Sequence, residues 1–317
     1  MLSVNYLVTG GAGFIGSHIV DKLLEKGNKV RVLDNFSTGR KENLAYSLDK
    51  VELIEGDVRD YQVVREAAEG IDVVLHQAAI SSVVKSVDDP VTTNAVNVDG
   101  TVNILQASRD ASVKRVVYAS SASVYGNNPD VPKRETMMPS PESPYAVSKL
   151  TGEYYCKVFS SLFGLHTVCL RYFNVFGERQ DPSSEYSGVI SRFISALLSD
   201  RNPTIYGDGE QSRDFVYVRN VVDANILAGT IDCRPGPVLN VGCSARTTLN
   251  QLVKELNSII GKNLTPIYQP PRAGDVRNSL ADITLIEKVL CYEPKIGFRQ
   301  GLEKTIDGHL RLRNPLV

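Results

Sequence analysis

The fold is decided by residues 6–16, YLVTGGAGFIG, from which the rest of the chain can be interpreted. An apolar, β-branched run leads into closely spaced glycines, and a helical pattern over 14–25 follows directly. Glycine suits a tight turn, a backbone that approaches a pyrophosphate, and a helix packed closely on a strand. The helix N-terminus then offers free N–H donors to an anion. The stretch therefore predicts a strand–loop–helix unit that binds phosphate groups.

Short β-branched runs alternate with longer helical patterns beyond this unit. We expect strands over 6–9, 29–34, 51–55, 72–76, 115–120 and 166–171, and helices over 90–110 and 145–163. A tight hairpin cannot join parallel strands, so strands separated by helices predict a parallel sheet covered on both faces. The expected fold class is α/β, a Rossmann-like doubly wound parallel sheet. A polar, proline-rich stretch over 127–144 interrupts the alternation and is long enough to be functional.

The pattern changes after Asn174. Glycine, proline and turn residues crowd 177–214 and 266–275, with a helical stretch over 249–260 between them. A chain of 317 residues is long enough for about two domains. We expect residues 1–173 to form the first domain, with some later segments returning to it. Residues 174–317 are expected to form a smaller, mixed α/β C-terminal substrate lobe that is interleaved with the first.

Composition excludes several classes of function. The 35 Lys and Arg residues against 36 Asp and Glu leave a net charge of −1, so no positive field is present to hold nucleic acid. No apolar run approaches the roughly 20 residues that span a bilayer, and a signal peptide is not evident, so we expect a cytoplasmic protein without a membrane partner. The five cysteines form no CxxC pair and are interpreted as reduced core residues; no metal site is expected.

An acidic residue ends the second predicted strand. A carboxylate at Asp34 would accept a hydrogen bond from a ribose 2′-hydroxyl and repel a 2′-phosphate, which favours NAD over NADP. Arg40 and Lys41 are near enough in sequence to moderate that preference. Two interpretations of Asp57 stay open. It lies near the adenine, or it caps a helix over 58–69.

A tyrosine and a lysine lie four residues apart in the helix that follows the proline-rich stretch. Tyr145 and Lys149 therefore project from one face of that helix. A phenol has a reference pKa of about 10, but a nearby ammonium and an oxidised nicotinamide both favour the phenolate. The pair could accept a hydroxyl proton while a hydride leaves the same carbon. The strand end over 118–126 supplies hydroxyls at the carboxyl edge of the sheet, where ligands bind in open α/β folds.

The glycine spacing from Gly10, the strand-end serine and Tyr-x-x-x-Lys, in this order, resemble the extended short-chain dehydrogenase/reductase family. Within it the chain is most similar to the nucleotide-sugar 4-epimerases of the UDP-glucose 4-epimerase type, over essentially its whole length. The resemblance implies that Ser121 is the catalytic serine, with Ser123 as a helper. It implies that Tyr145 is the acid/base and that Lys149 lowers its pKa and holds the nicotinamide ribose.

The same resemblance implies the residues that surround NAD. Asn97 would support the active-site backbone, and residues 77–79 would line the diphosphate and ribose. His76 is interpreted as a satisfied strand-end histidine rather than a catalyst. The expected cofactor-binding residues are Gly10, Gly13, Phe14, Ile15, Gly16, Asp34, Asn35, Ser37, Thr38, Gly39, Asp57, Val58, Gln77, Ala78, Ala79, Asn97, Tyr145, Lys149 and Tyr172.

Residues of the second lobe resemble the segments that bind the sugar nucleotide. Asn174 would hold the sugar diphosphate, and segments 207–214 and 272–275 would hold the nucleotide. A planar guanidinium suits a diphosphate. The substrate-binding residues expected on this basis are Ser81, Ser121, Ser123, Tyr145, Asn174, Gln180, Gly188, Arg213, Arg272, Asp275 and Ser279.

The resemblance implies NAD-dependent epimerisation at C4 of a UDP-hexose through a transient 4-keto intermediate. The alternatives are a nucleotide-sugar 4,6-dehydratase and a UDP-glucuronate decarboxylase, which carry an acid directly after the strand-end hydroxyl residue, where this chain has Ala122 and Ser123. A dinucleotide-binding regulatory protein is a further alternative. The small Ser279 at the gatekeeper position permits N-acetylated sugars besides UDP-glucose and UDP-galactose. Apolar residues on the helices over 90–110 and 145–163 suit a homodimer, or burial within one chain.

Overall fold

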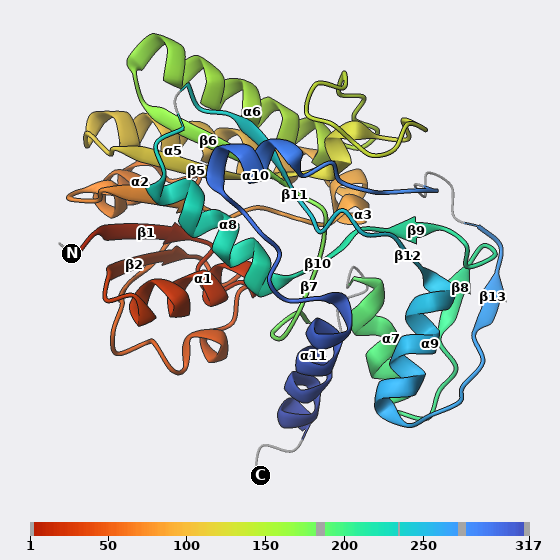
Figure 1. Ribbon diagram of the computed structural model, residues 1–317. Coiled ribbons are helices and arrows are strands. Elements are labelled where there is room, and N and C mark those ends of the chain that lie inside the picture. Colours follow the sequence, from red (N-terminus) through yellow and green to blue (C-terminus); the bar gives the residue numbers. More distant parts are fainter. Residues whose placement is uncertain (1–2, 182–187, 234, 272–276, 314–317) are drawn as a thin grey trace.

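The computed structural model describes residues 3–181, 188–233, 235–271 and 277–313. At its centre is a seven-stranded sheet in the order β11-β6-β5-β4-β1-β2-β3, and all of its strand pairs are parallel (Figure 1). This arrangement confirms the predicted Rossmann-like fold. The strands are β1 (Asn5–Thr9), β2 (Lys29–Asp34), β3 (Glu52–Glu55), β4 (Val73–His76), β5 (Arg115–Ser121), β6 (His166–Tyr172) and β11 (Val238–Val241).

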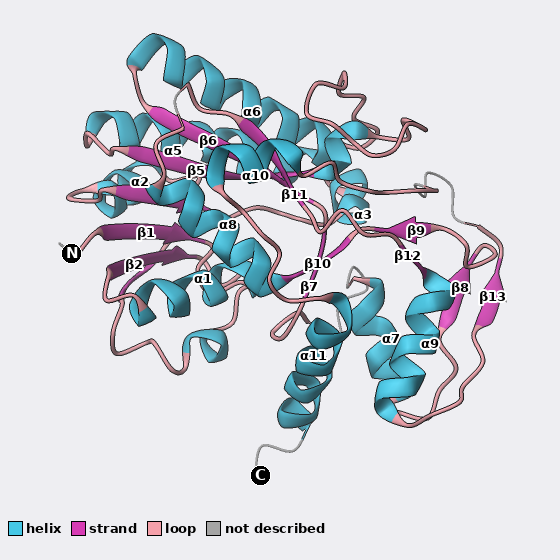
Figure 2. Ribbon diagram, viewed as in Figure 1, coloured by secondary structure: helices cyan, strands magenta, loops and turns pink. Residues whose placement is uncertain are grey.

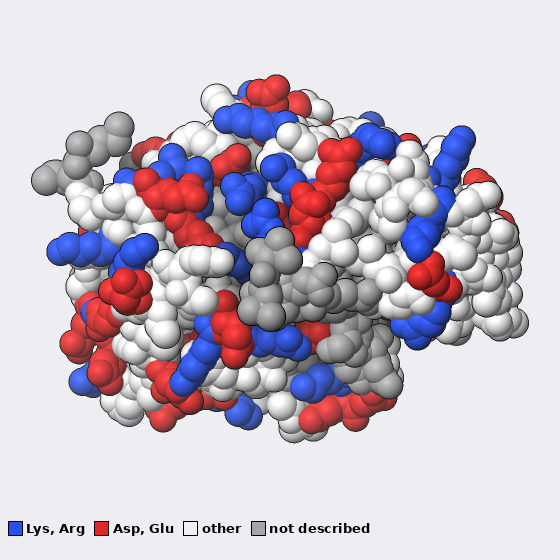
Figure 3. Space-filling view, turned by 90° about the horizontal axis from the view of Figure 1, so that it is seen from below, with Lys and Arg blue, Asp and Glu red and all other residues white. Residues whose placement is uncertain are grey.

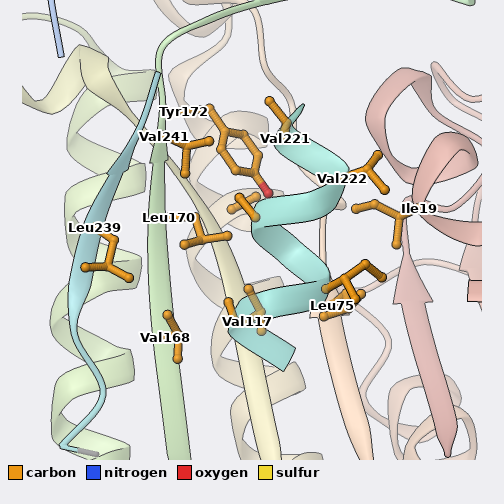
Figure 4. Close-up of a cluster of buried hydrophobic side chains, with 14 of the residues drawn as sticks. Ile19, Leu75, Val117, Val168, Leu170, Tyr172, Val221, Val222, Leu239 and Val241 are labelled. Atoms are coloured by element: carbon orange, nitrogen blue, oxygen red, sulfur yellow. The ribbon is translucent and has the colours of Figure 1, made fainter. Parts of the chain in front are cut away.

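Helices cover both faces of this sheet. On one face lie α1 (Phe14–Glu25), α8 (Val218–Thr230) and α10 (Thr284–Leu290), and on the other lie α2 (Tyr61–Ala68), α5 (Gly100–Asp110) and α6 (Pro144–Phe163). In Figure 4, Val117 and Val168 of neighbouring strands and Ile19 of α1 pack around α8, and all three side chains are fully buried. Burying an aliphatic side chain of this size contributes about 1.5–3 kcal/mol. The core therefore fixes the carboxyl edge of the sheet.

The helix expected over 90–110 is continuous but irregular. It consists of α4 (Pro90–Asn94), a π-helical segment (Ala95–Asp99) and α5. The wider π-helical turn contains Asn97, whose side chain is buried. Such turns are frequent at functional sites. The remaining short helices before α6 are α3 (Val83–Asp88), η1 (Lys41–Leu44) and η3 (Ala122–Tyr125).

A second group of elements packs beside the sheet, at the lower centre and right of Figure 2. It contains the two-stranded pairs β8–β13, β9–β12 and β7–β10, together with the helices α7, α9 and α11. Their bounds are β7 (Asn174–Phe176), β8 (Thr204–Tyr206), β9 (Ser212–Arg213), β10 (Phe215–Tyr217), β12 (Thr247–Thr248), β13 (Ile267–Gln269), α7 (Val189–Leu197), α9 (Leu249–Ile260) and α11 (Phe298–Arg313). β11 comes later than β7–β10 in the chain but pairs with β6 in the main sheet. The division of the chain at residue 173 stays a prediction.

The surface carries both signs of charge. Figure 3 shows acidic and basic side chains interspersed over one face. Within the described residues, none of the helices combines the length and the apolar character that crossing a membrane requires. Those residues also contain no group of three or more His, Cys, Asp or Glu side chains that could hold a metal ion.

The cysteines are all free thiols, but one expectation about them is wrong. Cys156 and Cys169 are buried, Cys233 and Cys243 are partly buried, and Cys291 is exposed. Cys291 follows the last buried residue of α10 and takes the left-handed C-cap position, with φ of 53°. Its place beyond the helix end, rather than its apolar neighbours, decides its exposure.

Candidate active site

The glycine loop leaves no room for a side chain at Gly10 or Gly16. A Cβ atom on Gly16 would lie 2.1 Å from the carbonyl oxygen of Gly10. Gly10 has φ of +66°, and a Cβ there would lie 2.7 Å from the backbone nitrogen of Ala78. Gly13 is the N-cap of α1, and no side chain of the described residues caps that helix. The loop is thus a backbone cradle beside a helix N-terminus, which fits a pyrophosphate.

Asp34 lies against this cradle. Its carboxylate accepts hydrogen bonds from the backbone N–H groups of Ala12 and Phe36, at 2.9 and 2.8 Å. A Cβ on Gly39 would lie 2.9 Å from both carboxylate oxygens, so a glycine is needed there as well. Burial raises the pKa of Asp34, and the two N–H groups oppose that shift. The backbone therefore fixes the direction of the carboxylate.

The two cations that could weaken a preference for NAD are paired with other carboxylates. Arg40 forms an ion pair with Asp181 at 2.5 Å. Lys41 forms one with Glu55 at 3.1 Å, and its ammonium lies 4.9 Å from the ring centroid of Phe36. Neither cation therefore forms an ion pair with Asp34.

A cavity of about 310 Å³ follows the carboxyl edge of the sheet and brings together most of the predicted cofactor residues. Of the substrate set, Ser81 and Tyr145 also line it. The predicted cofactor residues that line the cavity are Gly10, Gly13, Phe14, Ile15, Gly16, Asp34, Asn35, Ser37, Thr38, Gly39, Val58, Gln77, Ala78, Ala79, Tyr145, Lys149 and Tyr172.

Asp57 does not line the cavity, and its interpretation as a helix cap is wrong. The helix begins at Tyr61 and is capped by Asp60, which accepts from two backbone N–H groups. Asp57 instead accepts from Asn35 at 2.8 Å and from the Nε and Nη2 groups of Arg59 at 2.9 and 2.8 Å. The bond from Arg59 is the main cause that lowers the pKa of Asp57 to about 2. Arg59 itself lines the cavity, a position that sequence reasoning missed.

Asn97 lies behind the cavity rather than in its wall. Its amide bonds both the N–H and the carbonyl of Ile80, at 2.8 and 3.0 Å, and donates to the hydroxyl of Ser148 at 3.0 Å. Ser148 in turn donates to the carbonyl of Tyr145 at 2.7 Å. Asn97 therefore joins the segment after β4 to the first turn of α6.

Tyr145 and Lys149 line the cavity, and Ser121 lies beside Tyr145. Ser143 caps α6, which sets the first turn that carries Tyr145. The Lys149 ammonium donates to the carbonyl of Ala119 at 2.8 Å and lies 5.9 Å from the ring centroid of Tyr145. A hydrogen bond joins Tyr145 to Ser121. A phenol, a hydroxyl and a cation thus come together from the end of β5 and one face of α6.

Burial acts in opposite directions on the two titratable groups of this cluster. It lowers the pKa of Lys149 to about 7, because an ammonium is poorly solvated there. It raises the pKa of Tyr145, and the bond with Ser121 offsets part of that increase. The expected phenolate therefore depends on positive charge close to the ring.

The structure confirms the interpretation of His76 as a strand-end residue whose hydrogen bonds are satisfied. It lies at the end of β4, and its ring contacts the hydroxyls of Thr9 at 2.7 Å and Thr101 at 3.1 Å. Burial, reinforced by the charge of Lys149, lowers its pKa to about 3. Both ring nitrogens have hydrogen-bond partners, so His76 supports the strand end as a neutral residue.

The predicted substrate residues are more dispersed. Arg213 lies on β9 and donates to the carbonyl of Ser212 at 2.9 Å, the same carbonyl that accepts from the backbone of Ser279. A Cβ on Gly188 would lie 3.0 Å from the side-chain amide of Gln180. These two residues are therefore neighbours, but they lie outside the lining of the cavity. Apart from Ser81 and Tyr145, none of the described substrate residues lines the cavity: these are Ser121, Ser123, Asn174, Gln180, Gly188, Arg213 and Ser279. Arg272 and Asp275 lie outside the described residues.

Lys85 and Thr92 line the cavity although no sequence motif singled them out. Both belong to the short helices α3 and α4, which follow the β4 strand end. Their position depends on how these helices pack against α6, so the only signal was their closeness in sequence to Ser81.

Comparisons with known proteins agree with this arrangement. Residues 6–242 match the family "NAD dependent epimerase/dehydratase". A UDP-glucose 4-epimerase of Mycolicibacterium smegmatis is 42% identical over 95% of this chain and 97% of its own. A solved UDP-N-acetylglucosamine 4-epimerase of Methanobrevibacter ruminantium is 40% identical, with a TM-score of 0.94 over 98% of this chain and all of its own. A UDP-glucose 4-epimerase of Thermus thermophilus, solved with NAD, is 39% identical, with a TM-score of 0.88 over 96% and 98%.

Proposed function

Since this chain belongs to the NAD dependent epimerase/dehydratase family, we propose that it is an NAD-dependent UDP-hexose 4-epimerase. One observation carries the proposal: Tyr145 and Lys149, with Ser121 beside Tyr145, line a cavity that also contains a glycine cradle and an acceptor for ribose. Similar proteins named UDP-sugar 4-epimerases match almost the full length of the chain. The enzyme is an isomerase of nucleotide sugars.

The residues of the cavity fit NAD. The backbone cradle at Gly10–Gly16 would hold the pyrophosphate, and its shape requires glycine at both ends, because a Cβ there would clash with neighbouring backbone atoms. Asp34 would accept from the adenosine ribose, and Lys149 and Tyr145 would face the nicotinamide end. Bound there, NAD supplies an acceptor, and later a donor, for the hydrogen of C4, so that turnover consumes no cofactor.

Tyr145 is proposed to accept and return the proton at O4 of the sugar. Its phenolate takes that proton as C4 is oxidised and returns it when the 4-keto sugar is reduced on the opposite face. Lys149 provides the positive charge that the buried phenolate needs, since burial alone opposes ionisation of Tyr145. Ser121 keeps a hydroxyl within hydrogen-bond reach of the same oxygen. Binding through the diphosphate would let the sugar turn between the two half-reactions.

The residues after β5 favour epimerisation over elimination. A dehydratase or decarboxylase of this family would need a further acid and base next to Ser121, and η3 begins there with Ala122. Ser123 is the next hydroxyl, and its Oγ is buried without a hydrogen-bond partner among the described residues. A hydroxyl without a basic neighbour does not replace a carboxyl group in proton transfer.

The proposed sugars are UDP-glucose and UDP-galactose, together with their N-acetylated counterparts UDP-GlcNAc and UDP-GalNAc. The small side chain of Ser279 and the likeness to a solved UDP-N-acetylglucosamine 4-epimerase support acceptance of an N-acetyl group. Arg213, Arg272, Asp275 and Asn174 are proposed to hold the UDP group within residues 174–317. The first 173 residues are proposed to hold NAD.

A homodimer in the cytoplasm is the proposed state. The apolar residues of α5 that suggested pairing are largely buried within the chain, whereas α6 presents Tyr154 and Leu162, which are 57% and 71% exposed. Val87 of α3 and Val91 of α4 continue this apolar face. Pairing of these helices with a second copy would cover it. Light scattering should give the mass of two chains; the mass of one chain would contradict the dimer.

Proton NMR of the products tests the proposed reaction. The purified protein is incubated with UDP-galactose and, separately, with UDP-GalNAc, without added NAD. Formation of UDP-glucose supports the main proposal, and formation of UDP-GlcNAc supports the wider range of sugars. A 4-keto-6-deoxy sugar, UDP-xylose or no turnover would contradict epimerisation.

A further inference from the structure

A buried ion pair lies directly behind the catalytic cluster. Glu153 is on α6, one turn beyond Lys149, and Arg171 is on β6. The side chains of both are only 4% exposed. Arg171 donates to the two carboxylate oxygens of Glu153 at 2.8 and 2.7 Å, and its guanidinium lies 4.8 Å from the ring centroid of Tyr125. Two parallel bonds fix the Glu153 carboxylate in one orientation.

The same carboxylate holds the end of β5. The hydroxyl of Ser120 donates to Oε1 of Glu153 at 2.5 Å. The residue before Ser120 is Ala119, whose carbonyl accepts from Lys149, and the residue after it is Ser121, which bonds Tyr145. Consecutive residues at this strand end therefore contact successive turns of one face of α6. Ser120 is the middle residue of the three, and its partner Glu153 lies on the last of the three turns.

We propose that Glu153, oriented by Arg171 and acting through Ser120, is a positioning residue that sets the end of β5 relative to Tyr145 and Lys149. This inference rests on the proposed function. If the Ser120 bond is lost, the Ala119 carbonyl and the Ser121 hydroxyl are free to move away from the two groups that they contact. A misplacement of about 1 Å in an active site lowers turnover by about a hundredfold.

Stability alone is a poor explanation for this pair. Replacing a buried ion pair by apolar side chains of similar volume is often neutral or stabilising, because two charges no longer have to be desolvated. Besides Ser120, the titratable groups that interact with this pair are Tyr118 and Cys169 on the side of Glu153, and Tyr125 and Glu135 on the side of Arg171. None of these four is a cation that needs Glu153 as a partner. The partners of the Glu153 carboxylate are therefore Arg171 and the end of β5.

Ser120→Ala is the primary test, because it removes one hydroxyl and leaves the Glu153–Arg171 pair intact. We expect kcat on UDP-galactose to fall about 10- to 100-fold, with KM within about twofold of wild type. The matched control is Ser108→Ala, which also deletes a buried hydroxyl, one on α5 that has no hydrogen-bond partner among the described residues. The control should keep wild-type kcat. Equal kcat values for Ser120→Ala and wild type would overturn the proposal.

A spectroscopic titration separates positioning from general damage. The Tyr145 phenolate is followed by ultraviolet absorbance, as the difference from Tyr145→Phe. In Ser120→Ala the midpoint should move to higher pH, because an ammonium that loses its carbonyl acceptor supports the phenolate less. An unchanged midpoint would contradict the proposed path through Ala119 and Ser121.

A double variant, Glu153→Leu with Arg171→Met, removes the pair without leaving an uncompensated charge. It should fold with an unfolding free energy close to that of wild type, while its kcat falls at least as far as that of Ser120→Ala. A folded double variant with wild-type kcat would overturn the proposal. An inactive wild-type protein would instead refute the proposed function, so the two failures are distinguishable.

Discussion

The cofactor cavity and the second group of elements are built by different forces. Around the cavity, backbone meets backbone: the Gly16 position lies against Gly10, and Gly10 lies against Ala78. In the second group, loops are joined by backbone hydrogen bonds and by exposed side chains, such as Arg277 with Asp208 at 2.7 Å and Asn250 with the carbonyl of Asp208 at 3.1 Å. Steric contacts between backbones tolerate no substitution, whereas an exposed ion pair contributes about 0–1 kcal/mol.

The difference matches the demands of the proposed reaction. A cofactor that stays bound through each turnover suits a cradle with one fixed shape. A sugar that must turn between two faces suits a pocket held by adjustable contacts. If this is correct, substitutions at Tyr145, Lys149 or Ser121 affect chemistry, those in the cradle affect cofactor retention, and those in the second group affect substrate affinity.

The largest expected effect is that of Tyr145→Phe. Removal of the phenol oxygen takes away the group assigned to the O4 proton, and kcat should fall about a thousandfold. The variant should still copurify with NAD, which is measured by absorbance after denaturation. Turnover close to that of wild type would show that the base is misassigned.

Gly16→Ala should break the cradle. Its Cβ would lie 2.1 Å from a backbone oxygen, so the loop must shift, and we expect a loss of about 3 kcal/mol in unfolding free energy together with loss of copurified NAD. Gly297→Ala is the control, since a Cβ there meets no atom of the described residues within 4 Å. Urea unfolding and cofactor content measure both. A Gly16→Ala protein that retains NAD would contradict the steric account.

Arg213→Ala should affect the other region alone. Loss of a charge-assisted bond to a diphosphate corresponds to about 2 kcal/mol, so KM for UDP-galactose should rise about thirtyfold. The kcat value and the NAD content should remain those of wild type. A fall in kcat with unchanged KM would place Arg213 with the chemistry instead of with binding.

The smallest expected effect is that of acid on the free energy of unfolding. Folding lowers the pKa of His76 to about 3, so below the unfolded value of about 6.5 the unfolded chain binds the extra proton and folding is destabilised. Wild type should lose about 1 kcal/mol of unfolding free energy from this group between pH 6.5 and pH 5.5. In His76→Gln that part of the loss should disappear. Equal pH dependence in both proteins would contradict a buried neutral histidine.

The features that could be predicted from sequence depend on local chemistry. The strand–loop–helix unit follows from the spacing of Gly10, Gly13 and Gly16, and α1 spans the predicted 14–25. The shared helix face of Tyr145 and Lys149 could be predicted from the period of a helix alone. Asp34 needed only its place at the end of β2, where it lines the cavity. In each case the deciding neighbours lie within a few residues.

The remaining features depend on packing between distant segments. Arg59 reaches the cavity because Asp57 holds its guanidinium, and Asp57 could not be separated from Asp60 as a helix cap by sequence alone. The buried contact of Asn97 with Ile80 arises in a π-helical turn that no residue pattern predicted. The pairing of Glu153 with Arg171 joins a helix to a strand, and no motif links them.

The most direct measurement is proton NMR of UDP-galactose turnover in D₂O without added cofactor. The hydrogen of C4 should leave and return within one active site, so the UDP-glucose formed should carry protium at C4. Deuterium at C4, or a 4-keto-6-deoxy sugar in place of UDP-glucose, would contradict it.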